Sequence, residues 1–101
     1  MWVLAMFDLP VTTKRARREA AQFRRALQDD GFTMIQYSVY TRPCPSDENA
    51  RLHEKRIAAA LPQEGEVRTL VLTDLQFTRM RIYFQKRREN PESPPQQLTL
   101  F

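Results

Sequence analysis

Residues 2–10 read WVLAMFDLP, a continuous apolar run that ends in aspartate, leucine and proline. Such a run is typical of a buried strand, and proline ends it because proline has no N–H to donate to a neighbouring strand. Asp8 is therefore expected at the carboxyl end of this strand, where a carboxylate suits the edge of a sheet better than a core.

The residues after this strand predict a helix. Thr12 or Thr13 can cap a helix that runs to about Asp30, and Gly31 supplies the left-handed residue that ends it. Apolar side chains recur every three or four residues and form one stripe for packing on a sheet: Ala16, Ala20, Phe23 and Leu27. The basic side chains fall on the other side of the helix: Lys14, Arg15, Arg17, Arg18, Arg24 and Arg25.

The rest of the chain alternates strands with a second helix. Residues 32–41 are rich in β-branched and aromatic side chains, which predicts either one long bent strand or a tight pair. Ser46 caps a helix to about Leu61, whose inner face is Ala50, Ile57, Ala60 and Leu61. A strand at 67–72, a loop at 74–78 and a strand at 80–84 follow. This order predicts an α+β fold in which two helices pack on one face of a sheet.

Length and charge narrow the class of protein. The chain has 101 residues, of which 42% are hydrophobic, and these values fit one globular domain. We place that domain at 1–86, followed by a polar linker and apolar tail at 87–101. The formal charge of +4 is uneven, because eleven of the 16 basic residues lie in two segments, 14–25 and 79–88. This clustering favours a polyanionic partner.

Other features exclude function classes. The single cysteine, Cys44, rules out an internal disulfide and a cysteine-rich zinc site, and it fits the reducing cytoplasm. Two glycines are too few for a glycine-rich phosphate loop. No apolar run approaches the length of a membrane span, so no membrane partner is expected.

Several residues are candidates for chemistry, and each has a structural alternative. Asp8 could hold Mg²⁺, alone or with the same residue of a second chain, or it could cap the following helix. We interpret His53 as a residue at the core boundary and Cys44 as a structural thiol. Ser38 and Tyr40 could contact phosphate or be ordinary strand residues. Four aromatics could stack bases as the sheet aromatics of RNA-recognition modules do, but the chain lacks the basic-glycine-aromatic run of such a module. They are therefore expected in the core or in dimer contacts: Tyr37, Tyr40, Tyr83 and Phe84.

Three stretches together resemble the CRISPR-associated protein two family. They are residues 4–10, the arginine-rich helix and residues 36–40, which read QYSVY, and the match covers about residues 2–85. The resemblance implies a ferredoxin-like two-layer sandwich that forms a homodimer, in which Asp8 meets its counterpart and binds a divalent metal. Many members have tyrosine before the aspartate, whereas this chain has Phe7 and lacks that hydroxyl.

The family resemblance also implies function. Members serve in spacer acquisition, where they bridge integrase subunits and hold double-stranded DNA, and members act as metal-dependent endonucleases on RNA or DNA. Asp8 is then the catalytic and metal residue. Arg15 and Arg17 match helix arginines linked to nucleic acid, and Tyr40 matches an aromatic near the site. A toxin-like metal-dependent endoribonuclease that acts alone is the alternative.

The tail permits more than one partner. Leu98, Leu100 and Phe101 could form a strand exchanged with the dimer mate or dock the integrase subunit. Residues 97–101 also resemble the short peptide that docks bacterial proteins on the replication sliding clamp.

Overall fold

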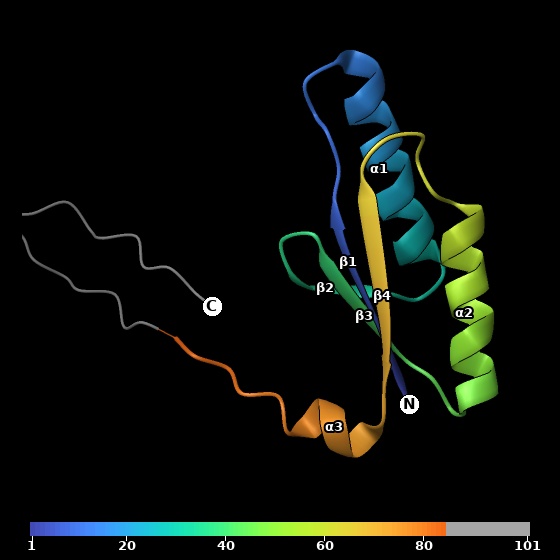
Figure 1. Ribbon diagram of the computed structural model, residues 1–101, viewed down its shortest axis with the longest axis vertical. Coiled ribbons are helices and arrows are strands. Elements are labelled where there is room, and N and C mark those ends of the chain that lie inside the picture. The colour runs from blue at the N-terminus through green and yellow to red at the C-terminus, as the bar shows by residue number, and fades with distance from the viewer. Residues whose placement is uncertain (85–101) are drawn as a thin grey trace, which may run out of the picture.

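The computed structural model describes residues 1–84, which form one antiparallel sheet with helices packed against it (Figure 1). The strands are β1 (Trp2–Asp8), β2 (Thr33–Gln36), β3 (Val39–Pro43) and β4 (Glu66–Leu72). Their order is β2-β3-β1-β4, and every neighbouring pair is antiparallel. The helices are α1 (Lys14–Asp29), α2 (Asp47–Ala59) and the short α3 (Asp74–Thr78).

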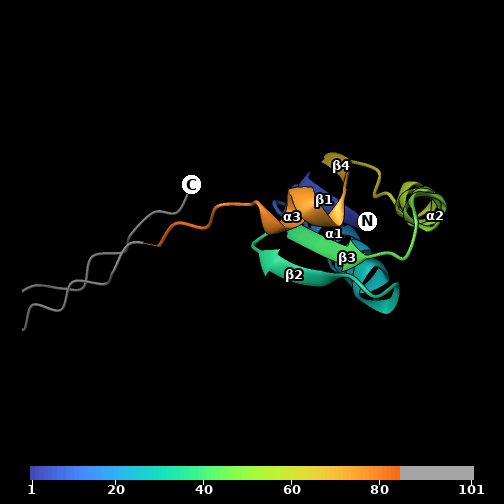
Figure 2. The same ribbon diagram turned by 90° about the horizontal axis from the view of Figure 1, so that it is seen from below.

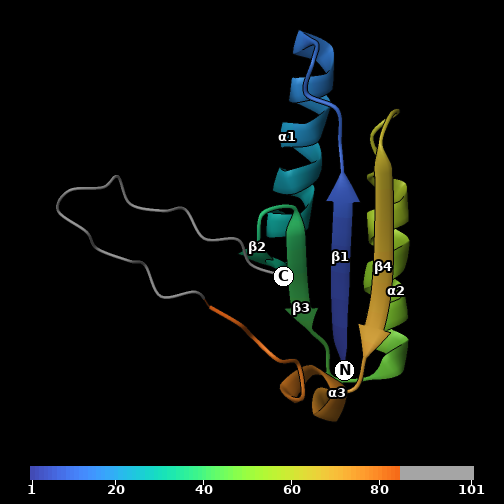
Figure 3. The ribbon, with the colours of Figure 1, turned by 60° about the vertical axis from the view of Figure 1, so that its left-hand side comes forward.

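Helices α1 and α2 cover one face of the sheet and leave the other face open. In Figure 3 both helices lie behind the strands, and Figure 2 shows the two layers from below. Residues of β1 alternate between the faces, since Val3, Ala5 and Phe7 belong to the buried core with Phe23 and Leu27 of α1. The order of elements predicted two helices on one face of a sheet, and the family resemblance implied this ferredoxin-like two-layer arrangement; both are confirmed.

The local signals for both long helices are confirmed. Thr13 caps α1 by accepting a hydrogen bond from the Ala16 N–H, and Ser46 caps α2 in the same way. Gly31 follows α1 with a φ of 88°, the left-handed conformation that favours glycine. Helix α2 ends at Ala59 rather than Leu61, and the Leu61 side chain is exposed instead of facing the core.

The segment at 32–41 is a tight strand pair. Strands β2 and β3 are joined by Tyr37 and Ser38, and Ser38 has a φ of 61°. The Phe7 N–H donates to the Ser38 carbonyl at 3.1 Å, so the turn is fixed to β1 one residue before Asp8.

Two expectations for the end of the domain are wrong. Residues 74–78 form helix α3 instead of a loop, because Thr73 and Gln76 make reciprocal side-chain caps at its start. Among the described residues, 80–84 form no strand. The expected boundary at residue 86 and the linker and tail at 87–101 lie outside the described residues.

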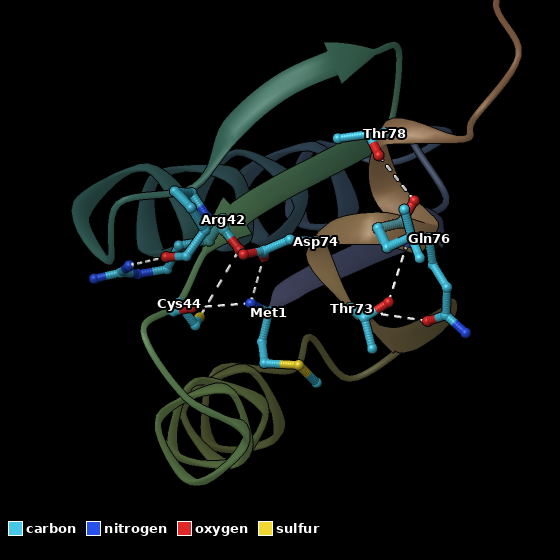
Figure 4. A network of polar contacts seen from close by, with 9 residues as sticks. Met1, Arg42, Cys44, Thr73, Asp74, Gln76 and Thr78 are labelled. Carbon is cyan, nitrogen blue, oxygen red and sulfur yellow. Dashed lines mark hydrogen bonds and ion pairs between the residues drawn. The ribbon is translucent and has the colours of Figure 1, made fainter.

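Helix α3 is tied to the start of β1. The Met1 amino group donates to the Cys44 carbonyl at 3.1 Å and to Asp74 Oδ1 at 2.6 Å (Figure 4). The Phe77 ring stacks on the Trp2 ring with centroids 3.9 Å apart. These contacts place α3 against the amino end of β1, far along the strand from Asp8. Within residues 1–84, no helix is long and apolar enough to cross a bilayer.

Candidate functional site

The Asp8 side chain is exposed at the carboxyl end of β1. Because Phe7 points into the core, Asp8 points to the open face. In the antiparallel pairing of β1 with β4, Asp8 lies directly opposite Glu66, which is also exposed. Arg68 Nε donates to Glu66 Oε1 at 2.6 Å, and these residues with Met6 line a shallow depression. The strand end therefore carries two carboxylates and one guanidinium.

Sequence reasoning missed Glu66. Nothing in the local sequence distinguishes Glu66 from the other acids of the chain, since only the β1–β4 register brings it opposite Asp8. A carboxylate at the first position of an antiparallel strand could have been paired with a carboxylate at the end of its neighbour, had the register been known.

The donor set at this end fits a hard divalent cation. Mg²⁺ commonly takes one or two carboxylates and completes its shell with water and phosphate oxygens. Asp8 and Glu66 offer such oxygens, and both are open to solvent. Among the described residues there is no cluster of three or more histidine, cysteine or acidic side chains that could enclose a metal. A metal here would thus be held by few protein ligands and would keep open positions.

The basic side chains of α1 form three groups around the helix. Arg15 lies toward the loop before β4, where it pairs with Glu19 at 3.3 Å and donates to Gln63 Oε1 at 2.5 Å. On the opposite flank, Arg17 donates to the Val11 carbonyl at 3.1 Å and Arg24 lies over the Phe7 ring. The third group points away from the sheet and is exposed: Lys14, Arg18 and Arg25.

Helix α1 differs in charge from its neighbour. It carries six basic and two acidic residues, whereas α2 carries three of each. The outward surface of α1 is therefore the strongest positive feature of the described chain, and we call the Lys14, Arg18 and Arg25 side chains the α1 basic row.

The residues expected near Asp8 lie in different environments. Phe7 and Tyr40 are buried and stacked, with ring centroids 5.5 Å apart, on the face covered by the helices. The Phe7 ring thus packs in the core. The tyrosine that many family members have at this position would therefore extend from the core side of β1, whereas Asp8 lies on the open face. Ser38 lies at the turn beside Phe7 and presents its carbonyl to β1.

Tyr37 does not lie in the core, which was one of the two places expected for it. Its side chain is 80% exposed, and Tyr83 and Phe84 are exposed as well. The predicted dimer contacts of these aromatics stay predictions.

His53 and Cys44 lie away from the Asp8 end. His53 is buried, and its Nδ1 lies 2.7 Å from Asp30 Oδ2, while Arg56 donates to Asp30 Oδ1 at 2.7 Å. Partial burial raises the pKa of Asp30, but the hydrogen bonds from His53 and Arg56 outweigh it and leave that pKa below its ordinary value. Burial raises the pKa of the Cys44 thiol, which fits a structural residue.

The remaining predicted site residues belong to the tail. Leu98, Leu100 and Phe101, proposed for tail docking, lie outside the described residues.

The strand order and the two covering helices define a ferredoxin-like α+β domain with an acidic strand end beside a basic helix. Residues 1–80 match the family model described as CRISPR associated protein Cas2. The chain belongs to this family.

Its relatives and a solved structure agree with this assignment. A protein of Parvibaculum lavamentivorans named CRISPR-associated endoribonuclease Cas2 is 54% identical over 101 residues, all of both chains. One of the same name from Flavobacterium psychrophilum is 45% identical and covers 100% of this chain and 88% of its own. The crystal structure of Streptococcus pyogenes Cas2 at pH 6.5 matches with a TM-score of 0.58 and 18% identity, over 80% of this chain and 96% of that one. That structure supports the fold.

Proposed function

We propose that this protein is a dimeric, metal-dependent endonuclease of the CRISPR system that cuts single-stranded RNA at the Asp8 end of its sheet. The observation that carries the proposal is the exposed Asp8 carboxylate with Glu66 opposite it, on a domain whose adjoining helix is strongly basic. The names of the relatives, which call them endoribonucleases, support RNA as the substrate.

The residues have separable roles in this proposal. Asp8 and Glu66 would hold the divalent metal, which when bound would lower the pKa of water and offset charge on the scissile phosphate. Arg68 fixes Glu66 through their 2.6 Å hydrogen bond and adds positive charge beside the phosphate. Arg17 holds the loop between Asp8 and α1 through the Val11 carbonyl, and we assign it a positioning role on that contact.

The open face of the sheet supports dimerisation. Met6 and Leu70 lie on this face with Asp8, and Leu70 is 48% exposed although its strand lies in the sheet. Packing two such faces together would bury these apolar side chains and bring two Asp8 residues to one interface. The alternation of β1 supports this, since it puts the carboxylate and the apolar patch on one side.

A direct test uses the purified full chain. We expect it to cleave a labelled single-stranded RNA with Mg²⁺ present and to leave it intact with EDTA. Sedimentation equilibrium is expected to give twice the 12.0 kDa chain mass. A monomer that cleaves equally well with EDTA would contradict both parts of the proposal.

A second function is favoured by the α1 basic row. These three exposed cations face away from the sheet and suit the phosphate backbone of duplex DNA, which they would bind without reading sequence. We propose that the dimer holds duplex DNA in this way and bridges integrase subunits during spacer acquisition.

Co-purification tests the second function. The full chain is mixed with the integrase subunit and duplex DNA and compared with a chain lacking residues 96–101. We expect one complex that contains all three components, and its loss on truncation would assign the docking to the tail. Growth arrest on expression without the integrase, with no complex formed, would instead favour a toxin-like ribonuclease.

A further inference from the structure

An exposed tyrosine at the Asp8 end of the sheet has no role in the function proposed above. Tyr37 occupies the first position of the β2–β3 turn, and 80% of its side chain is open to solvent. An exposed aromatic ring contributes little to the stability of the fold, because it buries little apolar surface. Its possible role therefore depends on the side chains around it.

The ring is backed by an arginine. The Arg24 guanidinium carbon lies over Tyr37, 5.7 Å from the ring centroid, and also over Phe7, 5.9 Å from that centroid. Arg24 belongs to α1, so it covers one side of Tyr37 from the helix layer. The contact of a guanidinium with two aromatic faces stabilises its position by cation–π attraction.

The turn fixes this arrangement at the Asp8 end of the sheet, on the side of α1, whereas the Asp8 side chain points to the open face. The Phe7 N–H donates to the Ser38 carbonyl, which fixes the residue after Tyr37 to the residue before Asp8. Phe7 is itself in the core against Phe23, with ring centroids 5.1 Å apart. The platform therefore rests on the rigid part of the domain, since its backing reaches the core through Phe7.

We propose that Tyr37, backed by Arg24, is a stacking platform for one unpaired nucleobase of a single-stranded nucleic acid that passes the Asp8 end. This inference rests on the proposed function and deepens it. Every base offers a flat π face, and stacking on an aromatic side chain tolerates any sequence. A base inside a duplex has both faces covered by its neighbours, so the platform selects unpaired nucleotides.

The platform and the α1 basic row bind different features of a nucleic acid. The row attracts phosphates whether the strand is paired or not, while Tyr37 contributes only when a base is free to stack. Loss of Tyr37 therefore weakens the binding of single strands selectively, and loss of the row weakens the binding of both.

The test compares Tyr37→Ala and Tyr37→Phe with the unaltered full chain, using fluorescein-labelled oligouridylate and a DNA duplex of equal length. Stacking on an aromatic is worth about 1–3 kcal/mol per base, so Tyr37→Ala is expected to weaken oligouridylate binding about 5- to 150-fold. Tyr37→Phe keeps the ring and is expected to stay within about twofold of the original affinity. Duplex affinity is expected to be unchanged in both variants.

Each outcome bears on the inference. If the unaltered chain binds oligouridylate and Tyr37→Ala binds it equally well, or loses duplex binding to the same degree, the platform is wrong while the proposed function stands. If the unaltered chain binds neither nucleic acid, both fail. Thermal unfolding checks that the variants fold, and a Tyr37→Phe chain that folds but loses single-strand affinity also overturns the stacking role.

Discussion

Removing part of the α1 basic row should change the salt dependence of DNA binding by a calculable amount. The perturbation is the double variant Arg18→Gln/Arg25→Gln, which removes two exposed cations from the outward side of α1. Among the described residues, neither arginine pairs with an acid, unlike Arg15, which pairs with Glu19. The variant therefore deletes charge without exposing a new carboxylate.

Counterion release gives the size of the effect. Each phosphate contact contributes about −0.9 to the slope of log K against log salt for duplex DNA. Losing two contacts makes the slope shallower by about 1.8 per protomer and lowers affinity about 60-fold at 0.1 M salt. For a single strand, the same change is about 1.4, since each contact contributes about −0.7.

Fluorescence anisotropy with a labelled duplex at several salt concentrations measures this slope. The matched control is Lys55→Gln, which removes one exposed charge from α2 and is compared with Arg18→Gln alone, since neither residue pairs with an acid among the described residues. Arg51 is not used, because it pairs with Asp47 and Glu54. We expect the control to change the slope much less, because α2 carries equal numbers of acids and bases. An equal change in both variants, or an unchanged slope in the α1 variant, would show that the basic row does not contact the phosphates.

Two further predictions concern stability. Asp30→Asn should cost about 1–3 kcal/mol at pH 7, because it weakens the charged hydrogen bonds to His53 and Arg56. Since folding lowers the pKa of Asp30, its stabilisation is complete above the ordinary value of 3.8 and fades as the pH falls through the lower folded value. Thermal unfolding at pH 7 and pH 3 should show the gap between variant and original narrowing, and a constant gap would refute this. Gly65→Ala should cost at least about 1–3 kcal/mol, because Gly65 has a φ of 105° and an added Cβ would lie 2.8 Å from the Asp8 carbonyl oxygen. Denaturant titration measures the loss, and an unchanged midpoint would contradict it.

Much of the fold could be predicted because its signals are local. The apolar run before Asp8, the stripe ending at Leu27 and the glycine at 31 each act within a few residues, and each defines an element boundary that the structure confirms. Helix α3 has a local signal too, the Thr73 and Gln76 caps, but it is short and lies in a polar stretch where a loop was the simpler interpretation.

The candidate site was harder to predict because it depends on strand register and on which side chains the tertiary structure exposes. Asp8 could be placed at a strand end, but Glu66 comes opposite it only through pairing with a strand almost 60 residues away along the chain. Tyr37 alternated plausibly with core residues, and the two-residue turn instead left it exposed. The alternation of side chains along a strand could not show whether Tyr37 is buried or exposed.

The positions of the charged residues could be predicted from the sequence, but their contacts could not. The sequence located the basic residues on one helix, yet it did not divide them by what they contact. Arg15 and Arg17 are held by neighbouring loops, and Arg24 lies over aromatic rings. On α1, the outward row is the group without such a contact among the described residues. Arg79 and Arg81, from the second basic segment, are exposed as well and follow α3.

The central claim is that the Asp8 carboxylate is the centre of RNA cleavage. The measurement that tests it most directly is the single-turnover cleavage rate of a labelled single-stranded RNA in Mg²⁺ by the original chain, Asp8→Asn and Asp29→Asn. Asp29 is an exposed acid at the opposite end of α1, so its change is chemically matched but distant. We predict that Asp8→Asn slows cleavage at least about 100-fold, corresponding to about 2.7 kcal/mol, and that Asp29→Asn leaves the rate unchanged. Equal rates for the original chain and Asp8→Asn would contradict the account.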